Sequence, residues 1–130
     1  MKQVHALVVD DNISNLGVLA HLLARQGAVC TEASSTSQLA GVLKNLTAVD
    51  VVFLDLELQA MNGYEIMRQL KTDVRFQSIP FVAYTAHLEE INMAHQKGFH
   101  SFLGKPVDAE KFPEQLDHIL NGEPVWSTGR

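Results

Sequence analysis

Short apolar runs alternate along the chain with stretches whose apolar residues recur at helical spacing. The runs contain many β-branched residues, and they predict strands that are buried inside the protein. Residues 49–54 form the most strand-like run, which we expect at the centre of a sheet. The predicted strands are residues 4–9, 29–33, 49–54, 81–84 and 100–103.

A helical pattern follows each predicted strand. Glycines stand where two of these helices are expected to stop, at Gly27 and Gly98. The predicted helices are residues 13–23, 39–46, 66–70, 88–97 and 112–120. This alternation predicts a doubly wound α/β fold, in which a five-stranded parallel sheet carries helices on both faces and the crossovers are right-handed.

The chain is expected to form one domain over residues 1–121, followed by a C-terminal tail over residues 122–130. The tail shows no periodic pattern, so it is either loose or packed back onto the domain through Val125 and Trp126. Met1 and the short tail favour a complete small protein over a piece of a larger one.

Composition narrows the class of protein. The chain has 130 residues, of which 46% are hydrophobic, as expected for one globular domain. Its net charge of -5 and the lack of a basic run argue against nucleic-acid binding. Cys30 is the single cysteine, which fits a reducing compartment, and no apolar stretch resembles a signal peptide or a membrane span. We therefore expect a cytoplasmic protein that binds neither nucleic acid nor membrane.

Residues suited to phosphoryl chemistry stand at the ends of four predicted strands. They are Asp10-Asp11, Asp55, Thr85 and Lys105-Pro106. Open parallel sheets bind ligands at the carboxyl ends of their strands, so these residues are expected to share one pocket. Three carboxylates beside a hydroxyl and an ammonium suggest a cation site with a nucleophile.

Each of these residues also has an ordinary structural explanation. The Asp10-Asp11 pair could cap the first helix, and Asp55 could cap a turn. Thr85 could be a plain β-branched strand residue, and a Lys-Pro pair is usually a turn. The shared position of these residues at strand ends favours the functional interpretation over four separate structural ones.

Four stretches of sequence together resemble one family. They are Leu7-Val8-Val9-Asp10-Asp11-Asn12, Phe53-Leu54-Asp55 with Met61-Asn62-Gly63, Tyr84-Thr85-Ala86, and Phe102-Leu103-Gly104-Lys105-Pro106. In this order and spacing, the chain resembles the receiver domain of bacterial two-component response regulators over about residues 3 to 121. The resemblance implies a flavodoxin-like fold with strand order 2-1-3-4-5.

The resemblance also implies a role for each site residue. Asp55 would be the phosphoacceptor, since a carboxylate can attack phosphorus directly. Mg²⁺ would be held by Asp10, Asp11, Asp55 and the main-chain carbonyl of Glu57. Lys105 would offset the charge of the incoming phosphoryl group.

Two further roles come from the same resemblance. The peptide bond before Pro106 would be cis. Thr85 and the aromatic Phe102 would form a switch that alters the face built from the fourth helix, fifth strand and fifth helix. Phe102 could also be an ordinary core residue.

The implied function is phosphorelay signalling. The phosphoryl group would come from the phosphohistidine of a sensor histidine kinase or a histidine phosphotransfer protein, and an unidentified downstream protein would read the switch. The chain would not be an enzyme beyond self-directed phosphoryl transfer and autodephosphorylation. The alternative is a phosphorylation-independent interaction module with the same fold; a small-molecule phosphatase is disfavoured because no substrate-binding cap is visible.

Three residues near the site depart from the family pattern or vary within it. We expect the side chain of Glu57 to point to solvent rather than into the site. Gln59 replaces a frequent proline, which predicts a less rigid loop. His87 is expected at the mouth of the pocket, where it could tune the attack of water on a phosphoaspartate.

Overall fold

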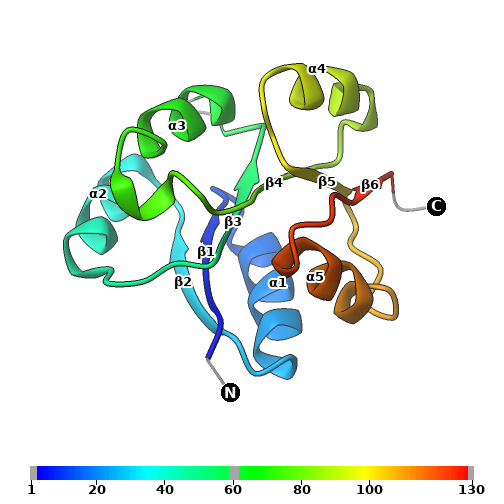
Figure 1. Ribbon diagram of the computed structural model, residues 1–130, viewed down its shortest axis with the longest axis horizontal. Helices are drawn as coiled ribbons and strands as arrows, with labels where there is room; N and C mark the ends of the chain where they lie inside the picture. The colour runs from blue at the N-terminus through cyan, green and yellow to red at the C-terminus, as the bar shows by residue number, and fades with distance from the viewer. Residues whose placement is uncertain (1–2, 59–61, 129–130) are drawn as a thin grey trace.

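The computed structural model describes residues 3–58 and 62–128. Within them lies one parallel sheet of six strands in the order β2-β1-β3-β4-β5-β6. The strands are β1 His5–Val9, β2 Val29–Ala33, β3 Val51–Asp55, β4 Phe81–Thr85, β5 Ser101–Gly104 and β6 Trp126–Ser127. The predicted doubly wound fold and the order of its five predicted strands are confirmed (Figure 1).

The prediction of five strands was wrong by one. β6 lies in the segment expected to be a tail, and it pairs with the outer edge of β5. Val125 and Trp126 are partly buried against the cores, so the packed alternative for the tail describes the structure and the loose one does not. Two residues are too few to show a periodic pattern, so this strand could not be predicted from the pattern of apolar residues.

The helices follow the predicted pattern with shifted ends. They are α1 Ile13–Arg25, α2 Thr36–Asn45, α3 Gly63–Leu70, α4 Ile91–Gln96 and α5 Phe112–Leu120, with 3₁₀ turns η1 Val74–Phe76 and η2 Leu88–Glu90. Side chains of Asn12, Ser35 and Asn62 accept hydrogen bonds from backbone N–H groups of the first turns of α1, α2 and α3. One shifted end concerns the predicted helix 88–97, which begins as a 3₁₀ turn and becomes α-helical only at Ile91.

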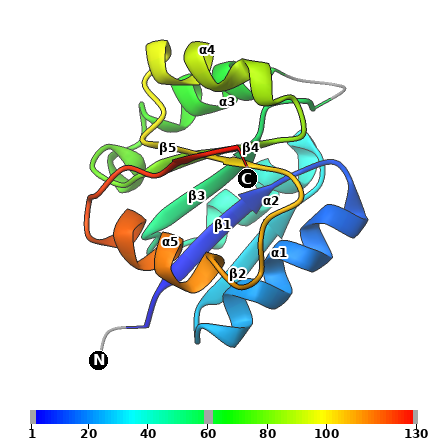
Figure 2. The same cartoon turned by 90° about the vertical axis from the view of Figure 1, so that its right-hand side faces the viewer.

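The helices form two layers, one on each face of the sheet. α1 and α5 cover one face, and α2, α3 and α4 cover the other (Figures 1 and 2). Side chains alternate between the two cores along the central strands, so that Val8 and Phe53 face α1 and α5 while Val9 and Leu54 face the opposite helices. Burial on both faces explains the continuous apolar runs that predicted these strands.

One edge of the sheet gathers the polar ends of the central strands. β1 pairs with β3, β3 with β4 and β4 with β5, all in parallel, so their carboxyl ends meet at the same edge. Val9 is paired with Leu54, and Thr85 with Gly104. The residues that follow these pairs are therefore placed side by side by the backbone ladder alone.

Gly63 makes close packing at this edge possible. A Cβ atom at Gly63 would lie 2.6 Å from the carbonyl oxygen of Asp55 and 3.0 Å from the Cα of Leu56. Both neighbours are backbone atoms, so they cannot rotate away as a flexible side chain would. The start of α3 therefore rests directly on the end of β3.

We predict that Gly63→Ala destabilises the domain by about 1 to 3 kcal/mol, because the added methyl group forces the backbone of α3 or β3 to shift. Urea unfolding followed by circular dichroism measures the change. The matched control is Gly41→Ala at an exposed position of α2, where a Cβ meets nothing within 4 Å. The control should gain about 0.5 to 1 kcal/mol from helix propensity. Equal effects of the two substitutions would contradict the packing argument.

Candidate functional site

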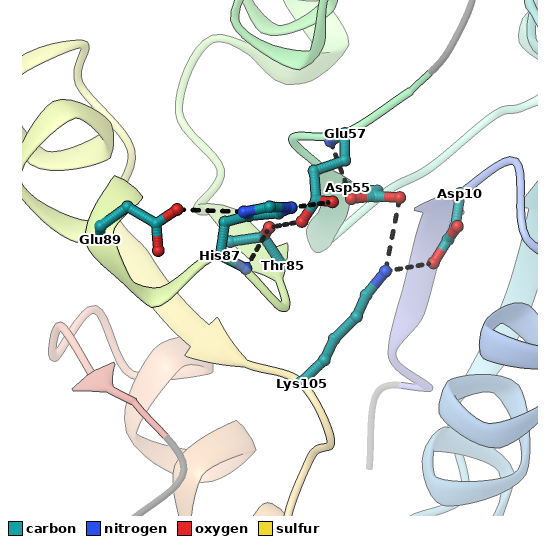
Figure 3. A network of polar contacts seen from close by, with 7 residues as sticks. All are labelled: Asp10, Asp55, Glu57, Thr85, His87, Glu89 and Lys105. Atoms are coloured by element: carbon teal, nitrogen blue, oxygen red, sulfur yellow. Dashed lines mark hydrogen bonds and ion pairs between the residues drawn. The ribbon is translucent and has the colours of Figure 1, made fainter.

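Two buried carboxylates lie at the ends of neighbouring strands. Asp10 directly follows β1 and is 0% exposed, and Asp55 is the last residue of β3 and is 3% exposed. Each accepts one backbone hydrogen bond from two residues further on: Asp10 Oδ1 from the N–H of Asn12 at 2.8 Å, and Asp55 Oδ1 from the N–H of Glu57 at 2.9 Å. These bonds fix both carboxylates at the carboxyl edge of the sheet, where Figure 3 shows the two side chains facing Lys105.

Lys105 reaches both carboxylates from the end of β5. Its Nζ lies 3.0 Å from Asp10 Oδ2 and 3.4 Å from Asp55 Oδ2, and its side chain is 12% exposed. The backbone N–H of Lys105 donates to the carbonyl oxygen of Thr85 at 2.8 Å. The Lys105-Pro106 peptide bond is cis. The lysine predicted to enter the pocket from a strand 50 residues downstream of Asp55 does lie there.

Negative charge is concentrated at this edge. The pKa of Asp55 is raised to about 6. Burial is the largest cause and the nearby Asp10 adds to it, while the Glu57 N–H and the Lys105 ammonium act in the opposite direction. Ligand atoms of Asp10, Asp11 and Asp55 all lie within 4.8 Å of one another. Three carboxylates at this separation, with one ammonium between two of them, match the oxygen ligands that a hard divalent cation prefers. The residues present therefore fit Mg²⁺.

Thr85 lies at the same edge, and its hydroxyl is engaged by residues of the chain itself. It is the last residue of β4 and is 0% exposed. Its Oγ1 donates a hydrogen bond to the carboxylate of Glu57 and accepts one from the N–H of His87 at 3.1 Å. The hydroxyl is thus held by a neighbouring acid at the pocket mouth.

The side chain of Glu57 is solvent-exposed, as expected, but its carboxylate contacts residues of the site. Its Oε1 accepts from Thr85, and its Oε2 lies 2.8 Å from Nε2 of His87 (Figure 3). Glu57 stands two residues beyond the end of β3 and His87 two beyond the end of β4, so strand pairing brings an acid and a base together. The hydrogen bond that His87 donates to the Glu89 carboxylate, together with the negative charge of Glu57, raises the pKa of His87 and favours its cationic form. The equal offsets from two neighbouring strand ends were the sequence signal for this contact.

The remaining predicted residues fall into two groups. Phe102 is fully buried in β5 and packs into the core beneath α4, so its position agrees with a core residue and leaves the switch role a prediction. Ligation through the main-chain carbonyl of Glu57 also stays a prediction. Gln59 and Met61 lie outside the described residues. Within residues 3–58 and 62–128, no helix combines the length and apolar character needed to cross a membrane.

The family comparison agrees with this arrangement. The response regulator receiver domain family matches residues 6–117, which include every residue placed in the site above. The chain belongs to this family. Receiver domains of this family are signalling domains of two-component systems, in which phosphoaspartate and Mg²⁺ are typical.

Related proteins differ greatly in length. The receiver chain is 32% identical over 113 residues to "Stress response regulator protein 1" of Meyerozyma guilliermondii, covering 83% of this chain and 51% of that protein. It is 29% identical over 119 residues to "Protein PilH" of Pseudomonas aeruginosa, covering 89% of this chain and 97% of that protein. It is 32% identical over 121 residues to "Transcriptional regulatory protein GlrR" of Escherichia coli, covering 92% and 27%. The chain thus spans about half or less of two of these relatives.

Solved structures show the same fold. A putative response regulator from Chloroflexus aurantiacus matches with a TM-score of 0.80 at 23% identity, covering 92% of this receiver chain and 99% of that chain. A signal receiver domain from Bacteroides fragilis matches with a TM-score of 0.75 at 27% identity, covering 93% and 97%. The sheet and its flanking helices are therefore those of receiver domains.

We predict that Asp55→Asn stabilises the metal-free receiver. Because the pKa of Asp55 is raised, the folded state binds more protons than the unfolded state between about pH 4 and 6, so stability falls as pH rises through this window. Asn removes that cost. Near neutral pH, in the presence of a chelator, the free energy of unfolding of the variant should be about 2 to 3 kcal/mol higher than that of the wild type.

Urea unfolding at several pH values measures this gain, which should vanish below about pH 4, where Asp55 is protonated in both states. The matched control is Asp117→Asn, which changes an exposed carboxylate on α5. Its effect should stay within about 0.5 kcal/mol at every pH. A variant that is less stable than the wild type near neutral pH would contradict the electrostatic argument.

Proposed function

We propose that this receiver accepts a phosphoryl group on Asp55 from the phosphohistidine of a sensor histidine kinase or a histidine phosphotransfer protein, in a reaction that depends on Mg²⁺. One observation carries the proposal: Asp55 is buried among Asp10, Asp11 and Lys105, where a carboxylate has neighbours for both a cation and an anionic group. A carboxylate that only capped a turn would need none of them.

Asp55 acts as the nucleophile. With a pKa of about 6, most Asp55 carboxyl groups are ionised near neutral pH and can attack phosphorus without a separate base. A bond forms between a carboxylate oxygen and phosphorus, and the bond from phosphorus to the imidazole nitrogen of the donor breaks. The electron pair of that bond stays on the donor imidazole. The products are an aspartyl-phosphate and a free histidine.

The surrounding residues position the reactants and balance charge. Asp10, Asp11, Asp55 and the main-chain carbonyl of Glu57 would hold Mg²⁺, which neutralises charge on the phosphoryl oxygens when it is bound. The ammonium of Lys105, already within 3.4 Å of Asp55 Oδ2, balances the charge of the incoming group. Phosphoryl transfer relies mainly on such alignment and charge stabilisation, so this set of residues suffices for self-phosphorylation.

The switch begins at Thr85. A phosphoryl group on Asp55 brings roughly -1.5 to -2 charges and competes with the Glu57 carboxylate for the Thr85 hydroxyl. Movement of Thr85 changes its neighbour strand β5, including buried Phe102, and so alters the face formed by α4, β5 and α5. A downstream protein reads this face. His87, bound to Glu57 at the pocket mouth, tunes the loss of the phosphoryl group to water.

A phosphorylation-independent interaction module is the second candidate. The hydrogen bond from Thr85 to Glu57 favours it, because the hydroxyl needed for switching is already engaged by an acid within the chain. Such a module would bind its partner equally well with and without phosphorylation. The buried group of acids with Lys105 favours the first candidate, since partner binding alone gives no reason to keep a costly cluster of carboxylates.

The direct test is incubation with acetyl phosphate and Mg²⁺, followed by intact-mass spectrometry. We expect one added phosphoryl group on the wild type, none on Asp55→Asn and at least about tenfold less on Lys105→Ala, which loses the charge next to the reacting oxygen. Replacing Mg²⁺ with a chelator should abolish labelling. Asp117→Asn serves as the control and should label like the wild type. An unlabelled wild type, or a labelled Asp55→Asn, would refute the proposed function.

A further inference from the structure

The C-terminal segment, residues 123–128, covers the outer edge of β5. Trp126 pairs with Phe102 and Ser127 with Leu103 in parallel register. The N–H of Phe102 donates to the carbonyl oxygen of Val125 at 2.8 Å, and the N–H of Val125 donates to Oγ of fully buried Ser101 at 3.0 Å. Figure 2 shows this segment in red along β5, with α4 above it and α5 below it. The segment thus satisfies edge groups that a partner strand would otherwise use.

Side chains of the C-terminal segment contact both helical layers. The ring of Trp126 lies 4.9 Å from the ring of His95 on α4, measured between centroids, and packs against the core beneath α4. Val125 packs against the opposite core, beside α5. Glu123 holds the start of the segment to α5, because its N–H donates to the carbonyl oxygen of His118 at 2.8 Å. The segment therefore lies across α4, β5 and α5, the elements proposed above as the output face.

Gly104 connects this segment to the site. A Cβ atom at Gly104 would lie 2.5 Å from Cδ2 of Leu88 and 2.9 Å from the backbone carbonyl of Thr128, so both neighbours occupy the space that a side chain would take. Gly104 is also the strand partner of Thr85. Leu88 begins the turn that leads from Thr85 to α4, which carries His95. A displacement of Thr85 therefore moves the surfaces against which Thr128 and Trp126 rest.

The docked segment pairs with β5 over a short ladder and stays partly exposed. Its strand is two residues long, and Val125, Trp126, Ser127 and Thr128 all keep intermediate exposure. Segments with little buried surface and short ladders open at low cost compared with the whole domain. A modest movement of β5 or α4 is therefore enough to shift the balance between docked and open forms.

We propose that residues 123–128 are a releasable cover of the β5 edge, docked while Asp55 is unmodified and released when Asp55 is phosphorylated. Release exposes the edge of β5 and the faces of α4 and α5 to an extended strand of a protein partner. This inference rests on the proposed function, because phosphorylation supplies the movement of Thr85. In this proposal, residues 123–128 compete with the protein partner for binding to the output face.

Trp126 is the only tryptophan of the chain, so its fluorescence reports directly on the cover. The full chain is treated with acetyl phosphate and Mg²⁺, and acrylamide quenching, hydrogen exchange of residues 123–128 and intact mass are measured on the same sample. In the phosphorylated chain we expect quenching to rise roughly twofold and exchange to accelerate about tenfold or more. Asp55→Asn should show neither change.

A second variant defines the released state without phosphorylation. In Gly104→Ala the new methyl group displaces the backbone of Thr128, so Trp126 should be as accessible to acrylamide as in the phosphorylated wild type. If this variant does not fold, Ser101→Ala removes the acceptor of the Val125 N–H at the other end of β5. Unchanged quenching in a folded variant would overturn the docking argument.

The outcomes separate the two proposals. A phosphoryl group on Asp55 with resting values of quenching and exchange would overturn the release and leave the proposed function standing. Absence of the phosphoryl group would overturn the proposed function, and the release with it. Phosphorylation together with faster exchange and stronger quenching supports both.

Discussion

The structure depends on one constraint: two carboxylates are buried next to each other at the ends of paired strands. Parallel pairing of β1 with β3 leaves no other place for Asp10 and Asp55, because the ladder fixes Val9 opposite Leu54. Burying like charges is costly unless hydrogen bonds and an opposite charge compensate. Two backbone N–H groups and the ammonium of Lys105 provide that compensation, and the cost that remains appears as the raised pKa of Asp55.

This residual cost is what makes the pocket chemically useful. A divalent cation that binds to a buried site with excess negative charge stabilises that site. One lysine ammonium alone does not balance the charge of the carboxylates. Backbone packing keeps the two acids in place, since Gly63 lets the start of α3 rest against the carbonyl oxygen of Asp55. The buried carboxylates at the end of β3 thus destabilise the domain, and apolar burial in the two cores offsets this effect.

Neighbouring strand ends also connect the site to the C-terminal segment. Thr85, Gly104 and the C-terminal segment occupy successive strand ends from β4 to β6, so each is in contact with the next. Glu57 and His87 stand at the start of this series of contacts and hold the Thr85 hydroxyl in its resting place. In the proposed switch, a new charge on Asp55 would therefore act first on the hydroxyl and only then on β5.

Much of this could be predicted from the sequence, because apolar runs that end in charged residues specify both the strands and the edge at which those residues gather. Asp10, Asp55 and Lys105 lie together as expected. The contacts of the Glu57 carboxylate were missed, since they depend on a contact with His87 that forms only after β3 and β4 pair. β6 was missed because a two-residue strand shows no periodicity of apolar residues. It is held instead by pairing with β5 and by the contact of Trp126 with the His95 ring.

The most direct test of the central claim is an NMR titration of the Asp55 carboxyl carbon in the metal-free protein and again with saturating Mg²⁺. Burial of the carboxyl group, with Asp10 beside it, predicts a titration midpoint of about 6 without metal. With Mg²⁺ bound beside it, the pKa should fall to about 4 or below, because a cation favours the ionised form. An ordinary pKa in the metal-free protein, unchanged by Mg²⁺, would contradict the account.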